Sequence, residues 1–118
     1  MRLIGIGIDI VEVNKIKKAI KKFGVNFLKR VFDKKELQNI SKNRVYYQRL
    51  AARFAAKEAV IKALSKKETL ALNEILILNK PNGAPYCEFK KDINVEVFLS
   101  ITHIEKYAVA CAIASLKD

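Results

Sequence analysis

The sequence predicts an α+β fold in which a largely antiparallel sheet packs on a long helix and several shorter helices. Three observations predict it. An alternating, Ile-rich segment begins the chain, helical patterns follow as far as residue 64, and further strand patterns end the chain. Because the last two strand patterns are separated by a hairpin-length connection, we expect them to pair antiparallel. The 118 residues suit a single domain spanning residues 1–118.

The first predicted elements are a strand and a basic helix. Residues 2–11, RLIGIGIDIV, alternate and are rich in β-branched side chains, so they predict a strand. Glycine weakens a strand, so Gly5 and Gly7 indicate close approach by another backbone or by a ligand. Asn14 is a candidate cap for a helix in which apolar residues recur at three- and four-residue steps, and Gly24 ends it. The other face of this helix is basic and carries lysines 15, 17, 18, 21 and 22.

Three more helices are predicted before residue 65. Residues 25–32 form a short one. Residues 33–41 form another, with Asp33 as N-cap and Glu36 three positions later, which is a capping box. A long helix follows over residues 45–64, because alanine, the best helix former, recurs throughout it.

The C-terminal part of the sequence predicts strands. Residues 74–79, EILILN, form one strand, and KPNGAPY at 80–86 is a turn marked by proline and Asn-Gly. Residues 94–101 alternate cleanly, and residues 106–114 form the last strand. The connecting segment 102–105, THIE, is short enough for a hairpin.

The composition indicates an anionic partner. Lys and Arg outnumber Asp and Glu by 23 to 12, for a net charge of +11, which suits nucleic acid, a phosphorylated ligand, an acidic protein or a membrane surface. Cys87 and Cys111 are too few for a zinc pattern, so we expect two reduced thiols. The apolar N-terminal segment contains Asp9 and Glu12 and lacks a cleavage site, so it predicts neither a signal peptide nor a membrane span. We therefore expect a cytoplasmic protein.

Two carboxylates are candidates for a metal site. Asp9 lies in the most apolar part of the first strand, where a charge is costly unless it is paired, exposed or bound to a metal. Glu12 points to the other face and is expected to be exposed. Glu58 could form an ordinary surface ion pair with Lys62 at i+4, but its apolar neighbours indicate that it faces another element. If Asp9 and Glu58 meet, they supply the hard oxygen ligands that magnesium prefers.

Basic side chains near these carboxylates are candidates for binding phosphate. Lys62, Arg53 and Lys57 lie on the same predicted helix as Glu58 and could supply positive charge. His103 ends the segment SITH at a strand end. It is either a loop histidine with local hydrogen bonds or a ligand for phosphate.

Four segments closely resemble the holo-acyl-carrier-protein synthase family, the small trimeric class of 4'-phosphopantetheinyl transferase. They are GIGIDIVEV at 5–13, RFAAKEAVIKA at 53–63, NGAPY at 82–86 and SITH at 100–103. The resemblance implies the α+β fold of these transferases, with active sites between adjacent subunits of a homotrimer. It also implies transfer of the phosphopantetheine arm of coenzyme A to a serine of acyl carrier protein. The other product is adenosine 3',5'-bisphosphate, and the reaction supports fatty acid biosynthesis.

The resemblance also implies roles for individual residues. Asp9 and Glu58 would ligate a magnesium ion that also holds the coenzyme A diphosphate, and Lys62 matches the family lysine at that diphosphate. Together these three residues form the predicted catalytic set. The predicted binding set for the nucleotide phosphates consists of Arg53, Lys62, His103 and Arg44, with Lys42 as a further possibility. Lys15 stands where the family usually has an arginine on its carrier-binding helix.

Elementary chemistry agrees with this reading. Phosphoryl transfer mainly needs positioning and neutralisation of charge at the diphosphate. The attacking serine hydroxyl must lose a proton, either to a water on the metal or to a carboxylate such as Glu58. No side chain resembles a dedicated nucleophile, so we expect direct attack by the carrier serine. The basic helix at 15–22 would dock the acidic carrier protein, and the alternative is a solvated surface face.

One segment departs from the family pattern. The family commonly has FGTG-like glycines after the long helix, whereas this chain has SKKETLALNEI. Binding through Ser65 and the neighbouring lysines stays open, but contacts by glycine backbone cannot be carried over. Lys15 in place of arginine also lacks bidentate geometry.

Two other functions stay open on the sequence. A basic nucleic-acid-binding module without catalytic activity suits the charge, but no stacking motif is present and Tyr46 and Tyr47 lie within a predicted helix. A regulatory domain that binds coenzyme A without turnover is the other. With the transferase reading preferred, we expect neither a membrane nor a nucleic acid among the partners.

Overall fold

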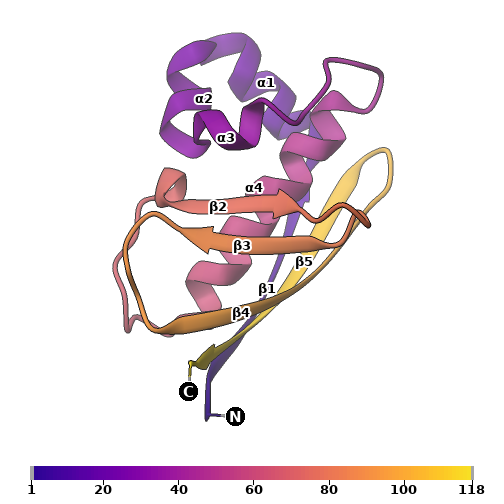
Figure 1. Cartoon of the computed structure of the whole chain (residues 1–118). Coiled ribbons are helices and arrows are strands. Elements are labelled where there is room, and N and C mark those ends of the chain that lie inside the picture. The colour runs from indigo at the N-terminus through magenta and orange to yellow at the C-terminus, as the bar shows by residue number, and fades with distance from the viewer. Residues whose placement is uncertain (1, 118) are drawn as a thin grey trace.

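The computed structural model describes residues 2–117, which alternate between strands and helices as the α+β prediction requires. The elements in chain order are β1 (Arg2–Glu12), α1 (Val13–Phe23), α2 (Val25–Val31), α3 (Lys34–Leu37), α4 (Tyr46–Ala63), the 3₁₀ helix η1 (Leu72–Glu74), β2 (Ile75–Asn79), β3 (Pro85–Phe89), β4 (Val95–His103) and β5 (Tyr107–Leu116) (Figure 1). Among these residues, no helix is both long enough and apolar enough to cross a membrane.

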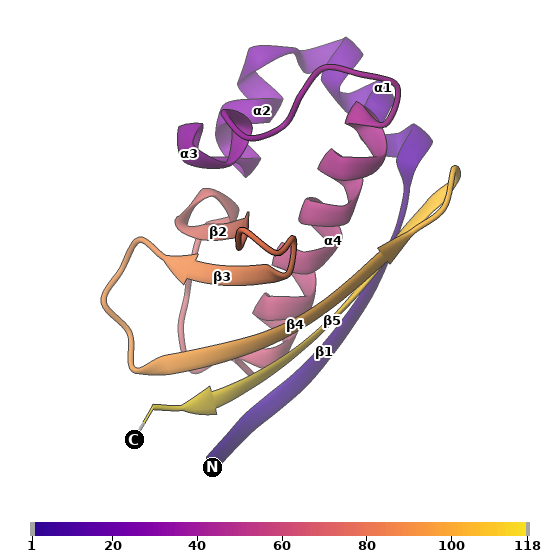
Figure 2. The same cartoon turned by 45° about the vertical axis from the view of Figure 1, so that its right-hand side comes forward.

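The strands form two antiparallel sheets rather than one. One sheet has the order β1-β5-β4, and the other is the hairpin β2-β3. Helix α4 lies between them, packed across one face of the three-stranded sheet, while α1, α2 and α3 gather around one end of α4 (Figure 2). The antiparallel prediction is thus confirmed, and the split into two sheets is new. β3 and β4 lie near each other but do not pair, so the hairpin remains a separate sheet.

Strand β3 was missed by the sequence analysis, which assigned residues 80–86 to a turn. Pro85 begins β3 opposite Asn79, and the first position of a strand tolerates its missing N–H. The turn is therefore shorter than predicted. The final hairpin connection is shorter as well, because β4 extends through His103.

The predicted cap of α1 is also wrong. Helix α1 begins at Val13, before Asn14, and its N-cap residue Glu12 makes no side-chain hydrogen bond. A tertiary contact takes over part of this role, because the backbone N–H of Val13 donates to the carbonyl of Lys106 at 2.9 Å. Gly24 ends the helix as predicted, and its N–H donates to the carbonyl of Ile20.

Helix α4 and strand β1 approach so closely that only glycine fits between them. A Cβ atom on Gly7 would lie 2.0 Å from the carbonyl oxygen of Ala59, and one on Gly5 would lie 2.5 Å from that of Ala63. Both distances are far below van der Waals contact, and the obstacle is helix backbone, which cannot rotate away. The two glycines therefore admit another backbone, which was one of the two predicted reasons for them.

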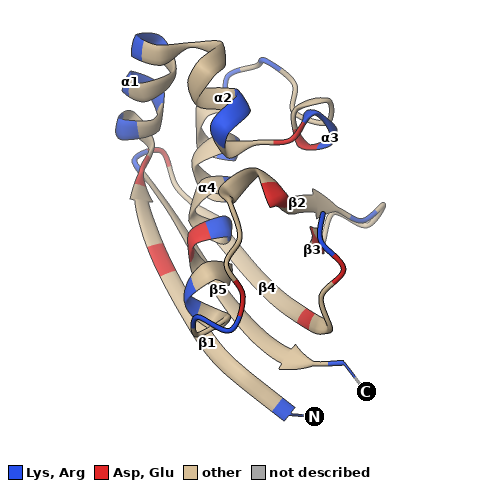
Figure 3. Cartoon of the chain, turned by 90° about the vertical axis from the view of Figure 1, so that its left-hand side faces the viewer, with Lys and Arg blue, Asp and Glu red and all other residues tan. Residues whose placement is uncertain are grey.

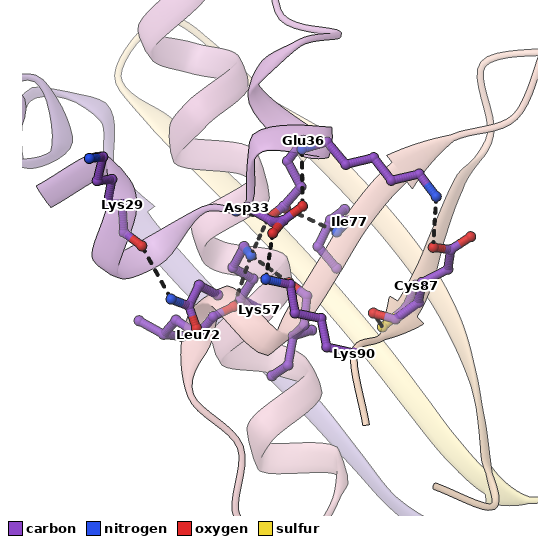
Figure 4. A network of polar contacts seen from close by, with 12 residues as sticks. Lys29, Asp33, Glu36, Lys57, Leu72, Ile77, Cys87 and Lys90 are labelled. Carbon is purple, nitrogen blue, oxygen red and sulfur yellow. Dashed lines mark hydrogen bonds and ion pairs between the residues drawn. The ribbon is translucent and has the colours of Figure 1, made fainter. Parts of the chain in front are cut away.

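A buried ion pair joins α4 to α3 and β2 (Figure 4). The ammonium of Lys57 lies 2.6 Å from Oε1 of Glu36, and both side chains are completely buried. Lys57 also donates to the carbonyls of Leu72 and Ile75, and the N–H of Ile77 donates to Oε2 of Glu36 at 3.0 Å. Burial lowers the pKa of Lys57, and the Glu36 carboxylate opposes that shift.

The ion pair gives Glu36 and Lys57 structural roles that the sequence did not predict. Glu36 forms the predicted capping box with Asp33, whose N–H it accepts at 3.0 Å, but it also supplies the counter-charge for Lys57. The prediction that Lys57 supplies charge to phosphates is therefore wrong, because its ammonium faces the interior. The two cysteines in the described part of the chain are free thiols, as expected, and burial raises the pKa of Cys87 to about 12.

Replacing Lys57 by methionine tests the structural role of this pair. Lys57→Met leaves the Glu36 carboxylate buried without a counter-charge, so we expect the free energy of unfolding to fall by about 3–5 kcal/mol. Urea unfolding followed by circular dichroism measures the change. Lys35→Met is the matched control, because it breaks an exposed pair with Glu88 and should cost less than about 1 kcal/mol. Equal losses in the two variants would contradict the assignment.

Candidate active site

Asp9 and Glu58 meet where β1 contacts α4. Asp9 follows Gly7 on the face of β1 that the helix covers, and Glu58 immediately precedes Ala59, whose carbonyl lies over Gly7. Both carboxylates line one cavity of about 450 Å³. Figure 3 shows the acidic segment of β1 facing the acidic segment of α4. The predicted meeting of these two side chains thus occurs within a single chain.

Lys62 completes this cluster, and it pairs with Asp9 instead of with Glu58, its neighbour one turn away on the helix. Its ammonium lies 3.2 Å from Oδ1 of Asp9 and donates to the carbonyl of Ile8 at 2.9 Å. The ion pair of Lys62 is therefore with the strand and not with Glu58 on its own helix. About half of the Lys62 side chain is exposed, so its ammonium is accessible to a ligand.

The pKa of Glu58 is raised by its surroundings. Burial raises the pKa of Glu58, the nearby charge of Asp9 raises it further, and Lys62 offsets part of the shift. A partly buried carboxylate whose pKa is raised beside a second carboxylate provides a suitable environment for a cation. Among residues 2–117 no group of three or more His, Cys, Asp or Glu side chains could hold a metal. A donor set of two carboxylates suits magnesium, which commonly takes its other ligands from water and phosphate.

Lys15 lines the same cavity as the two carboxylates, together with Phe54 and Tyr107. The basic helix α1 therefore reaches the edge of the candidate metal site, because it begins directly after β1. Glu12 is exposed, as predicted, although it also lines this cavity at the end of the strand.

Arg53 and His103 meet in a second cavity, of about 620 Å³. Arg53 is 8% exposed, and its Nη2 donates to Oδ1 of Asn79 at 2.6 Å. Its Nη1 is buried and is the single buried side-chain nitrogen or oxygen among the described residues without a hydrogen-bond partner. Burial lowers the pKa of Arg53 and nearby Arg49 lowers it further, while Glu36 acts in the opposite sense. An anion would satisfy the free nitrogen.

These two cavities lie on different sides of α4. Arg53 and Glu58 are five residues apart, which corresponds to about 140° around a helix. One chain thus brings Asp9, Glu58 and Lys62 together, and separately brings Arg53 and His103 together. It does not unite the two groups.

Arg44 belongs to neither group in this chain. It lines a third cavity with Lys17, Tyr47 and Glu105, and the ammonium of Lys17 lies 5.4 Å from the centre of the Tyr47 ring. Lys42 is exposed in the segment before α4. The residues predicted to form one nucleotide pocket therefore line different cavities of this chain.

Asn79 is the site residue that sequence reasoning missed. It ends the apolar strand β2 just before the turn, where asparagine is common for reasons of turn chemistry alone. Its contact with Arg53 joins positions 26 residues apart and leaves no local signal.

The segment after α4 keeps a glycine-type backbone without glycine. Ser65 and Lys66 have φ angles of 52° and 65°, in the left-handed region that costs other residues about 1–2 kcal/mol each. Ser65 and Lys66 follow the long helix, where the family pattern commonly has glycines. Oγ of Ser65 donates weakly to the carbonyl of Ile4 at 3.4 Å, so the segment is tied back to β1.

The chain matches one family of known proteins over most of its length. The family model described as the 4'-phosphopantetheinyl transferase superfamily matches residues 5–112. A holo-acyl-carrier-protein synthase of Thermodesulfovibrio yellowstonii is 43% identical over 106 residues, covering 90% of this chain and 93% of the relative. One of Caldicellulosiruptor saccharolyticus is also 43% identical, covering 98% and 99%.

Solved structures have the same fold. A holo-acyl-carrier-protein synthase from Bacillus anthracis, determined in complex with coenzyme A (3',5'-ADP), superposes with a TM-score of 0.86 at 30% identity, covering 99% of this chain and 100% of that one. The Helicobacter pylori holo-acyl-carrier-protein synthase, in complex with coenzyme A, gives a TM-score of 0.82 at 32% identity, covering 93% and 99%.

Proposed function

The chain belongs to the holo-acyl-carrier-protein synthase family of the 4'-phosphopantetheinyl transferase superfamily, and from this premise we propose how its residues act. The enzyme transfers the 4'-phosphopantetheine group of coenzyme A to a serine of apo acyl carrier protein and releases adenosine 3',5'-bisphosphate. In our proposal this reaction supports fatty acid biosynthesis in the cytoplasm. The observation that carries the residue assignment is the cluster of Asp9, Glu58 and Lys62 between β1 and α4.

The reaction is a direct displacement at phosphorus. The serine oxygen of the carrier forms a bond to the phosphorus that bears pantetheine, and the bond from that phosphorus to the bridging oxygen breaks. The bridging oxygen leaves with its electron pair on adenosine 3',5'-bisphosphate. The serine proton goes to a base, either solvent or the carboxylate of Glu58.

Asp9 and Glu58 would hold a magnesium ion in this scheme. Their oxygen donors fit that ion, and its positive charge would offset the burial and the Asp9 charge that together raise the pKa of Glu58. When bound, magnesium supplies charge neutralisation at the diphosphate. The half-exposed ammonium of Lys62 adds a further positive charge beside Asp9.

Arg53 and His103 would bind the phosphates of the nucleotide end of coenzyme A. The unpartnered Nη1 of Arg53 supports this, because a phosphate oxygen is a natural acceptor for a buried guanidinium nitrogen. Since their cavity and the carboxylate cavity lie on different sides of α4, we propose that the complete site combines one cavity from each of two adjacent subunits.

The outer face of the three-stranded sheet supports assembly into a homotrimer. Ile6, Ile8 and Ile10 point away from α4 and are 68%, 63% and 63% exposed, and Phe98 on β4 is 42% exposed on the same face. No element of the described chain covers this face (Figure 2). Adjacent apolar side chains so exposed are typical of a surface that is buried in an assembly.

Helix α1 would dock the acyl carrier protein. Its lysines form a basic face, clearest at the end of the molecule that carries α1 and α2 (Figure 3). Phe23, at the end of the helix, is 56% exposed beside Lys22, so the surface combines charge with an apolar anchor. Acyl carrier proteins are acidic, and a basic surface would both attract and orient them.

Transfer to the carrier is the direct test of the enzymatic role. With apo acyl carrier protein, coenzyme A and magnesium, we expect the carrier to gain the mass of one phosphopantetheine group. Asp9→Ala and Glu58→Ala should each lower kcat/KM by at least about 100-fold, because each removes a donor to a charge-stabilising ion. Mass spectrometry of the carrier measures the reaction.

The control for these variants is Glu12→Ala, which removes an exposed carboxylate from the same cavity edge and should retain activity within about threefold. No mass gain on a cognate carrier, or transfer by Asp9→Ala at the unmodified rate, would refute the assignment. A trapped covalent pantetheinyl-enzyme would instead refute direct attack by the carrier serine.

The assembly proposal predicts a solution mass of about three times the 13.4 kDa chain, measured by light scattering after size-exclusion chromatography. Ile8→Glu places a charge on the apolar sheet face, so we expect it to give monomers with an unchanged circular dichroism spectrum. Phe23→Glu adds the same charge at another exposed apolar residue and should remain trimeric. A monomeric unmodified protein at micromolar concentration would contradict the proposal.

The docking proposal predicts a change in carrier recognition alone. Lys18→Glu reverses one charge on α1, so we expect KM for the carrier to rise about three- to tenfold. The dissociation constant for coenzyme A, measured by calorimetry, should not change. Lys117→Glu makes the same charge change at an exposed site away from α1 and serves as the control. If both variants raise KM equally, general charge and not docking on α1 explains recognition.

A further inference from the structure

We propose that Asn79 is a positioning residue that holds the guanidinium of Arg53 so that it can bind a phosphate group of the nucleotide. This inference rests on the proposed function, in which Arg53 belongs to the nucleotide site. The geometry behind it consists of two hydrogen bonds, Arg53 to Asn79 and Asn79 to Gly83, and of one buried nitrogen of Arg53 that has no partner.

Arg53 keeps its positive charge available although it is buried. A buried guanidinium usually pairs with a carboxylate, but the hydrogen-bond partner here is the neutral amide oxygen of Asn79, at 2.6 Å. An amide orients the guanidinium without cancelling its charge. The positive charge therefore remains available to a ligand, at the cost of desolvation, which lowers the pKa of Arg53.

Asn79 is itself held in one orientation. Its Nδ2 donates to the carbonyl of Gly83 at 3.0 Å, which leaves Oδ1 facing Arg53. Two backbone hydrogen bonds fix the turn that carries Gly83. The N–H of Gly83 donates to the carbonyl of Lys80 at 2.8 Å, and the N–H of Lys80 donates to the carbonyl of Ala84 at 2.9 Å. Gly83 has a φ of +90°, which other residues rarely adopt. Arg53 is thus held by a rigid turn through a single amide.

The cavity that Arg53 lines suits an anion. Its wall contains two arginines and one histidine, namely Arg49, Arg53 and His103, and it contains no Asp or Glu. Nη1 of Arg53 has no protein partner and is buried, so it remains for an acceptor that enters the cavity. A phosphate offers several acceptor oxygens and the opposite charge. Asn79 fixes one side of the guanidinium and leaves this nitrogen free.

The test replaces the amide by a carboxylate of the same shape. Asn79→Asp keeps the acceptor oxygen but forms an ion pair with Arg53, so we expect the dissociation constant for adenosine 3',5'-bisphosphate to rise about tenfold. Asn79→Asp loses the donor to the carbonyl of Gly83 but gains an ion pair with Arg53, so the melting temperature should stay close to that of the unmodified protein, whereas a merely structural role for Asn79 predicts a clear decrease. Isothermal titration calorimetry and thermal unfolding of the full-length protein measure the two quantities.

A double-mutant cycle with Arg53→Met shows whether Asn79 acts through Arg53. In the Arg53→Met background, Asn79→Asp should change the dissociation constant by less than about twofold, because the charge it would neutralise is gone. If Arg53→Met alone does not weaken binding, the proposed nucleotide site fails. If Arg53→Met weakens binding but Asn79→Asp binds as the unmodified protein does, only the present inference fails.

A second variant keeps the inference testable if Asn79→Asp does not fold. Asn79→Ala removes the orienting acceptor without adding a charge, so we expect KM for coenzyme A to rise about fivefold while kcat changes by less than about twofold. Equal losses in kcat and in kcat/KM, with KM unchanged, would overturn the positioning role.

Discussion

The close contact between the backbone of α4 and strand β1 is the constraint on which the candidate active site depends. Gly7 allows the carbonyl of Ala59 to approach to a distance that any side chain at position 7 would prevent. Asp9 lies two residues along the strand from this contact, and Glu58 lies next to Ala59 on the helix. The contact therefore brings together two carboxylates that are 49 positions apart in the chain, and the ammonium of Lys62 is one helical turn further along.

Three charged side chains of helix α4 enter different environments, and each environment has a different physical outcome. Glu58 reaches the cavity beside β1 and stays partly accessible, so its charge is available to a cation. Lys57 turns into the core, where Glu36 and two backbone carbonyls satisfy its ammonium. Arg53 lies beneath the β2-β3 hairpin with one nitrogen unpartnered. Burial and partner, not residue type, distinguish a structural cation from one that can bind a ligand.

The cavity of Asp9 and Glu58 and the cavity of Arg53 and His103 are connected through the buried core of the protein. The Lys57–Glu36 pair joins α4, which carries both Arg53 and Glu58, to α3 and to β2, the strand that ends at Asn79. The network in Figure 4 thus holds the hairpin that positions Arg53 against the helix that carries Glu58. This arrangement explains why so many of the polar contacts of the chain surround a residue that touches neither cavity.

The sequence by itself determined the features that depend on local periodicity and on short motifs. Alternation identified β1 and β4, the alanine-rich pattern identified α4, and the glycines of β1 indicated a close approach. The tertiary structure alone decided which partner each charged or polar side chain takes. Lys57 pairs with Glu36 across 21 positions, and Arg53 pairs with Asn79 across 26. Such contacts leave no periodic trace, because a side chain's partner depends on how distant elements pack and not on the residues beside it.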